Sequence, residues 1–249
     1  MIKFFSFSIY IIYLSKWFSY INISMKSMTV VKNFLSLKKN VADICKKINR
    51  DPDEINIVAV SKGQDKKKIK DLISFSHFCY GENRLEETEK KWSFIRNNNI
   101  KLHYIGALQS KKVKKLAPLY DVIETLDSES SAKEFANFFL SKKISLNFPE
   151  IYIQINIARE PQKRGVMPEN FNNFLTLCKT KYNLKIKGAM CMAPYGKDPE
   201  KYFNDMKNLC KINLIKNISM GMSNDYQKAI FHGSNNIRIG SKIFENEDG

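Results

Sequence analysis

Apolar residues along the chain alternate between two patterns. Short apolar runs, typical of buried strands, are followed by stretches in which apolar residues recur every three to four positions, as on the inner face of a helix. After an amphipathic helix over 31–50 and a turn at Asp51-Pro52-Asp53, the runs predict eight strands. These are Ile55–Val60, Phe78–Gly81, Leu102–Leu108, Val122–Leu126, Ile151–Ile157, Ile186–Met192, Ile218–Met222 and Ile237–Phe244.

Each predicted strand except the last is followed by a helical pattern. The first such helix is capped by Asp65 and turns Ile69, Leu72 and Ile73 to one side. The others run through Trp92, from Ser110 to Leu116, over 130–143, 168–181 and 199–211, and from Asp225 to Phe231. Alternating strands and helices imply a parallel sheet, because parallel strands need crossover connections. Eight of them predict an α/β fold closed into a (β/α)₈ barrel.

An open doubly wound sheet is the alternative, and it predicts a glycine-rich turn after the first strand. The chain has Ser61-Lys62-Gly63-Gln64 there, which does not fit that motif. No linker divides the rest, so we expect residues 31–249 to form a single barrel domain. Residues 1–30 differ: Phe4 to Leu14 is an aromatic, apolar run too short for a membrane span. This segment is either a targeting leader or a wrongly assigned start, with Met25 or Met28 as the true first residue.

The formal net charge is +16, with lysine runs at 66–70 and 111–115. Such runs attract phosphorylated molecules or nucleic acid, but they are more often solvated helix faces, and no nucleic-acid motif accompanies them. Five widely spaced cysteines without a CxxC pair indicate reduced thiols in a reducing compartment. The three histidines lack metal-ligand spacing, and His103 is interpreted as a hydrogen-bonded core residue. We therefore expect a cytoplasmic protein, or one in a mitochondrion or plastid if the leader is genuine.

The carboxyl ends of barrel strands carry the chemistry in this fold. Lys62 follows the first strand and Arg238 lies in the eighth, and the alternation of side chains turns both inward on neighbouring strands. An arginine beside a lysine disfavours the charged amine, which favours imine formation. Ser223, Gly240 and Ser241 offer hydroxyl and backbone N–H groups to a phosphate. This combination predicts a pyridoxal 5'-phosphate (PLP) site with Lys62 as the Schiff-base residue.

Six segments, taken in order, resemble the PLP homeostasis proteins, also called the YggS-like or proline synthase co-transcribed family. They are Val58-Ala59-Val60-Ser61-Lys62, Tyr80-Gly81-Glu82-Asn83, the stretch from His103 to Lys111, Gln154-Ile155-Asn156, Ser219 to Asp225, and Ile237-Arg238-Ile239-Gly240-Ser241. The resemblance covers about residues 35–245. It implies the barrel of fold-type III PLP enzymes, as in the N-terminal domain of alanine racemase.

The resemblance also implies roles for individual residues. Lys62 would form the Schiff base, Asn83 would lie near the ring oxygen, and Arg238 would face the pyridine nitrogen. Ser219, Ser223, Gly240 and Ser241 match the phosphate-binding segments. The chain departs from the family pattern at Arg84, Ala107, Gly63-Gln64 and Glu245, where an aromatic residue, histidine, Thr-Lys and glycine are usual.

Four functions fit these features. The first is a PLP carrier or regulator in vitamin B6 homeostasis, a monomer that supplies apo-PLP enzymes. The second is a PLP enzyme such as an amino-acid racemase. That activity needs acid–base groups on both faces of the substrate, one of them from a second domain that we do not expect here because the sequence ends at Gly249. The third is a barrel for another phosphorylated ligand, and the fourth is nucleic-acid binding. We expect the first, with no nucleic acid and no stable membrane span.

Overall fold

The computed structural model describes residues 29–141 and 148–245. Its parallel strands form a closed barrel in sequence order, and β1 pairs with β8 to complete the ring. The strands are β1 Asn56–Val60, β2 Cys79–Glu82, β3 Lys101–Tyr104, β4 Val122–Leu126, β5 Glu150–Ile155, β6 Ile186–Cys191, β7 Asn217–Ser219 and β8 Asn236–Ile239. The predicted (β/α)₈ barrel is confirmed.

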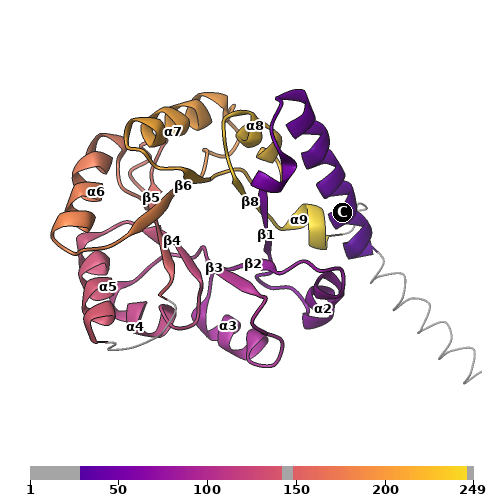
Figure 1. Ribbon diagram of the computed structural model, residues 1–249, viewed down its shortest axis with the longest axis horizontal. Coiled ribbons are helices and arrows are strands. Elements are labelled where there is room, and N and C mark those ends of the chain that lie inside the picture. The colour runs from indigo at the N-terminus through magenta and orange to yellow at the C-terminus, as the bar shows by residue number, and fades with distance from the viewer. Residues whose placement is uncertain (1–28, 142–147, 246–249) are drawn as a thin grey trace, which may run out of the picture.

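Helices surround the barrel in a single outer layer (Figure 1). They are α2 Lys66–Ser74, α3 Leu85–Trp92, α4 Val113–Leu116, α5 Glu129–Ser141, α6 Phe171–Thr180, α7 Glu200–Ile212, α8 Tyr226–Phe231 and α9 Ser241–Phe244, with 3₁₀ turns at Pro52–Glu54, Ser110–Lys112 and Pro168–Asn170. Within the described residues, none of the helices has the length and apolar character that a membrane crossing requires.

An N-terminal helix over 29–47 lies beside α9, on the side of the barrel where the ring closes (Figure 1). The Nδ2 of Asn33 donates to the carbonyl oxygen of Glu245 at 3.0 Å. Just after the helix, Nη1 of Arg50 donates to the carbonyl oxygen of Ser234 at 2.7 Å. The N-terminal helix and the four-residue α9 thus lie together on the side of the barrel where β8 pairs with β1. Residues 1–28 of the proposed leader lie outside the described residues, and Thr29 and Val30 already belong to the helix.

The main core lies between the strands and the helices. Ile57, Ala59, Ile237 and Ile239 point outward from β1 and β8 into this layer and are buried there. The predicted cap of α2 is confirmed, because the side chain of Asp65 accepts from Lys67 N at 2.9 Å. All five cysteines are free and buried, as expected for reduced thiols.

Three predicted strands run three or more residues past the ends of the real ones. The segments expected at Leu102–Leu108, Ile218–Met222 and Ile237–Phe244 leave the sheet at Tyr104, Ser219 and Ile239. Their remaining apolar residues, such as Leu108, Met220 and Phe244, are still buried, but in turns and in α9. An apolar run indicates that its residues are buried, but it does not distinguish a strand from a buried turn. The three segments that turn away early form part of the wall of the barrel mouth.

The inside of the barrel is partly polar. Inward positions include Val58, Tyr152 and Met190, but also the buried polar residues His103, Glu124, Ser219 and Arg238. Gly188 makes room for Tyr152, because a Cβ there would lie 2.7 Å from the tyrosine ring. Buried polar groups are costly unless they form hydrogen bonds with one another. Such bonds therefore fix the positions of these side chains inside the barrel.

Candidate functional site

A cavity of about 920 Å³ opens at the carboxyl ends of the barrel strands. Residues that follow β1, β2, β3, β6 and β7, together with the end of β8 and the start of α9, form its wall. Six of the seven residues predicted from the sequence line it: Lys62, Asn83, Ser223, Arg238, Gly240 and Ser241. Segments that lie far apart in the sequence thus meet at one site.

Lys62 lies at the corner of a tight turn directly after β1. Gln64 N donates to the carbonyl oxygen of Ser61 at 3.1 Å, and Gly63 has a φ of +69°. A positive φ at the third position is typical of a type II turn and suits glycine. The Lys62 side chain is exposed, and within the described residues its amine has no hydrogen bond or ion pair. The amine is therefore free to react with a ligand in the cavity.

A buried lysine holds this turn from below. Lys91 of α3 is 5% exposed and donates to the carbonyl oxygen of Ser61 at 2.6 Å, to Glu82 Oε1 at 2.9 Å and to Glu87 Oε1 at 2.7 Å. Glu87 Oε1 also accepts from Gly63 N at 2.6 Å. These contacts are not predicted from the sequence, because a lysine in a charged helix is usually solvated. Glu82, a carboxylate at the end of the otherwise apolar β2, is the sequence feature that could have indicated a buried partner.

Arg238 is fixed much more firmly than Lys62. Its side chain is almost fully buried, on β8 opposite Val58 of β1. Nη1 donates to Ser219 Oγ at 2.6 Å, and Nη2 donates to the carbonyl oxygen of Cys191 at 2.9 Å. The inward parity and the strand adjacency predicted for Lys62 and Arg238 place both at the cavity, as found.

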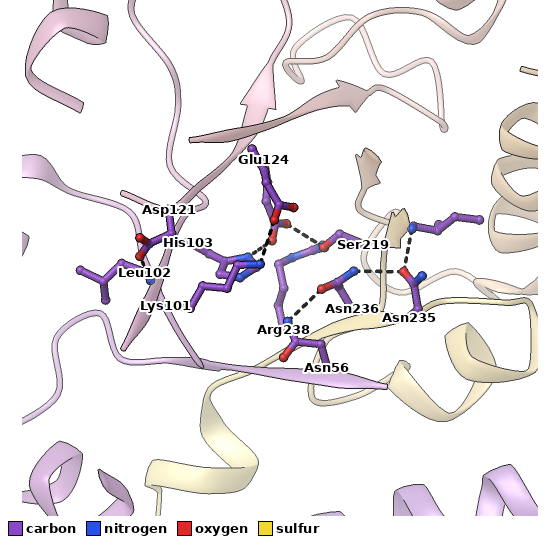
Figure 2. Close-up of polar contacts among 12 residues, drawn as sticks. Asn56, Lys101, Leu102, His103, Asp121, Glu124, Ser219, Asn235, Asn236 and Arg238 are labelled. Carbon is purple, nitrogen blue, oxygen red and sulfur yellow. Dashed lines mark hydrogen bonds and ion pairs between the residues drawn. The ribbon is translucent and has the colours of Figure 1, made fainter. Parts of the chain in front are cut away.

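Behind Arg238, a chain of polar groups crosses the barrel (Figure 2). Ser219 Oγ donates to Glu124 Oε2 at 2.6 Å, and Glu124 Oε1 lies 2.6 Å from His103 Nδ1. Glu124 Oε2 lies 3.7 Å from Arg238 Nη1. Ser219 was expected in a phosphate-binding segment, but its side chain is fully buried beneath Arg238 and does not line the cavity. Its hydroxyl is already used by Glu124 and Arg238.

Electrostatics reinforce this polar chain. Burial opposes charge on His103, but its contacts with Cys79 and Glu124 outweigh that effect and raise its pKa to about 10. Burial likewise opposes charge on Glu124, yet His103, Arg238 and Ser219 lower the pKa of its carboxyl group. A carboxylate between two cations is thus stabilised inside the barrel. His103 is the hydrogen-bonded core residue that the sequence predicts.

Two hydroxyls at the cavity have capacity for an anion. Ser241 begins α9 directly after Gly240, and its side chain has no hydrogen bond within the described part of the chain. Within the same residues, Ser223 Oγ has only a long contact of 3.5 Å, from Lys242 N. At the outer rim, Met192 and Met222 are partly exposed and Tyr195 is 95% exposed. Among residues 29–141 and 148–245, no cluster of His, Cys, Asp or Glu side chains is placed to hold a metal ion.

Comparison with known proteins shows the family of this chain. No family model matches it. It is 31% identical to the pyridoxal phosphate homeostasis protein of Haemophilus influenzae, covering 87% of this chain and 95% of that protein. The Schizosaccharomyces pombe protein of the same name is 32% identical, covering 76% of this chain and 82% of its own length. The chain belongs to the pyridoxal phosphate homeostasis protein family.

Solved structures agree on the fold of this family member. PipY of Synechococcus elongatus PCC7942, in a structure with PLP bound, superposes with a TM-score of 0.67 at 23% identity, covering 82% of this chain and 99% of PipY. The alanine racemase of Clostridium difficile 630 also gives 0.67, at 13% identity, covering 89% of this chain but 57% of the racemase. The shared element is the barrel of fold-type III PLP proteins, as the sequence predicts.

Proposed function

We propose that this chain binds PLP through an imine on Lys62 and acts in intracellular PLP homeostasis, without catalytic turnover of its own. It would work as a monomer and supply cofactor to apo-PLP enzymes. Family membership supports the role in homeostasis. PipY, with the same barrel, holds PLP in its solved structure.

The observation that carries the proposal is the contrast between a free amine and a fixed cation at one cavity. Among residues 29–141 and 148–245, the amine of Lys62 has no partner at the mouth, and Arg238 is held rigidly in the wall. Ser223, Gly240 and Ser241 lie on the same wall and have the hydroxyl and backbone groups that a phosphate ester binds. Asn83 adds an amide without a side-chain hydrogen bond within the described residues. Lys62 thus fits the aldehyde of PLP, and Arg238 and Asn83 fit its ring. The hydroxyl and backbone groups fit its phosphate.

PLP supplies an aldehyde that condenses with an amine and a ring that can accept electron density. Imine formation makes a C=N bond to the Lys62 nitrogen, and the aldehyde oxygen leaves as water. The protein contributes the Lys62 amine as nucleophile and binding groups that hold the aldehyde beside it.

The presence of Arg238 in the cavity favours a PLP carrier over a PLP enzyme. A guanidinium keeps its proton in a protein, and here Ser219 Oγ accepts a hydrogen bond from Arg238 Nη1 while Glu124 Oε2 lies 3.7 Å from the same nitrogen. A ring nitrogen facing it would therefore receive a hydrogen bond but no proton, which weakens the ring as an acceptor of electrons. Tyr195 is the one tyrosine among the cavity-lining residues that could exchange a proton with the second face of a substrate. Its side chain is 95% exposed. Both features disfavour racemase chemistry.

A spectral titration tests the proposal. Adding PLP to the purified chain should give the near-visible absorption of an imine, and Lys62→Ala should abolish it. A chain that stays colourless at saturating PLP would overturn the proposal and favour a different phosphorylated ligand.

An assay on amino acids separates carrier from enzyme. The PLP-loaded protein is incubated with a panel of L-amino acids, and the products are analysed for D-isomers and amines. We expect no turnover, together with transfer of PLP to an added apo-enzyme. Sustained formation of D-isomers that is lost in Lys62→Ala would identify a racemase instead.

A further inference from the structure

The peptide segment around Lys62 is held by groups that do not face the cavity. Lys62 is exposed, but Ser61 before it is fully buried. The carbonyl oxygen of Ser61 accepts from both Gln64 N and Lys91 Nζ. On the other side, Gly63 N donates to Glu87 Oε1, which also accepts from Lys91 Nζ. One buried ammonium group therefore ties both flanks of Lys62 to α3.

The bonding of Lys91 is complete. An ammonium group has three N–H donors, and the acceptors on Ser61, Glu82 and Glu87 use all three. The carboxylate of Glu82 is anchored in turn by Ser61 Oγ at 2.7 Å and by Trp92 Nε1 at 3.0 Å. Lys91 is thus held by all of its donors, whereas the amine of Lys62, which lies between Ser61 and Gly63 of the same network, has no partner among the described residues.

Stability alone does not account for this arrangement. Buried ion pairs are often no more stabilising than apolar residues of similar size, because both charges lose their hydration. Glu82 also keeps its Oε2 buried and without a partner among the described residues. A core designed only for stability would avoid that penalty. The network lies directly beneath the turn that presents Lys62, which suggests a role in the reaction of that residue.

We propose that Lys91, with Glu82 and Glu87, is a positioning group that clamps the Ser61–Gly63 turn and so holds the Lys62 amine where it meets the PLP aldehyde. Without the clamp, the turn samples more conformations, and the amine must be ordered each time the imine forms. The rate and the equilibrium of imine formation should therefore fall, while contacts with the ring and the phosphate remain. This inference rests on the proposed function of Lys62.

Two ligands separate positioning from general structural damage. PLP can form the imine, whereas pyridoxamine 5'-phosphate has the same ring and phosphate but no aldehyde. The full chain carrying Lys91→Met is titrated with both, next to wild type and Lys90→Met, which removes an exposed lysine from the same helix. We expect Lys91→Met to lower the imine equilibrium constant by about tenfold or more, as for loss of a charge-assisted hydrogen bond. Its affinity for pyridoxamine 5'-phosphate should stay within about twofold of wild type, and Lys90→Met should match wild type with both ligands.

Glu87→Gln keeps the test decisive if Lys91→Met does not fold. It weakens the tie to Gly63 on the partly exposed side of the network, and it should slow imine formation without changing affinity for pyridoxamine 5'-phosphate. Unchanged imine formation in the folded variants, or an equal loss of affinity for both ligands, would overturn the inference. Absence of the imine in wild type would instead contradict the proposed function of Lys62.

Discussion

Two residues of the cavity, Lys62 and Arg238, are held in opposite ways. Lys62 has a fixed backbone and a free side chain, because Lys91 and Glu87 bind the peptide groups around it and no residue in the described part of the chain binds its amine. Arg238 has a fixed side chain, bonded through Ser219 and Cys191 and backed by Glu124. A residue that must form and release a covalent bond needs mobility at its tip, whereas a residue that orients a ring needs rigidity. The difference assigns capture to Lys62 and orientation to Arg238.

Glu124→Gln should have the largest effect on stability. It leaves His103 and Arg238 without their shared carboxylate, and breaking a buried ion pair costs about 3–5 kcal/mol. Chemical denaturation of wild type and variant measures this free energy of unfolding. Thr125→Val on the same strand is the matched control, because the Thr125 hydroxyl is buried without a partner among the described residues and its loss should cost little. Equal stability of Glu124→Gln and wild type would show that Arg238 is not held through Glu124.

The same network predicts a pH dependence. The pKa of His103 is raised from 6.5 to about 10 in the folded protein, so its charge stabilises the fold fully below pH 6.5. That contribution should be lost progressively as pH rises toward 10. Denaturation at several pH values between these limits should show decreasing stability in wild type and a shallower decrease in Glu124→Gln. A flat wild-type profile over this range would contradict the charged state of His103.

Ser241→Ala should weaken PLP binding by about 1 kcal/mol, or roughly fivefold, because one hydroxyl bond to the phosphate is lost. Ser130→Ala, on the exposed face of α5, provides the control. Affinity for pyridoxamine 5'-phosphate measures the effect apart from the imine. Full retention of affinity would place the phosphate elsewhere in the cavity.

Lys62→Ala should have the smallest effect on stability. The side chain is exposed and makes no hydrogen bond within the described residues, so the free energy of unfolding without ligand should change by no more than about 0.5 kcal/mol. Denaturation of the ligand-free proteins checks this. A substantial loss would mean that the Lys62 side chain is held as Arg238 is, and the contrast between the two residues would fail.

The sequence predicts the main features of the site because they depend on local rules. Alternation along strands and the adjacency of the first and eighth strands were enough to bring Lys62 and Arg238 together. The predicted ends of the third, seventh and eighth strands were wrong, since buried apolar residues such as Phe244 occur equally in turns and short helices.

The supporting networks could not be predicted in the same way. Lys91 bonds to Ser61, 30 positions away, and Glu124 bonds to Ser219, 95 positions away. Neither partner is implied by a local pattern. The position of Ser219 beneath Arg238 depends on the same tertiary packing, and only the family resemblance had drawn attention to it.

Borohydride trapping tests the central claim most directly. Wild-type protein is mixed with PLP, reduced so that any imine becomes a stable amine, digested, and mapped by mass spectrometry. The account predicts a single phosphopyridoxyl label on the peptide that contains Lys62, with none on Lys91. Labelling at another lysine, or no labelled peptide, would contradict it.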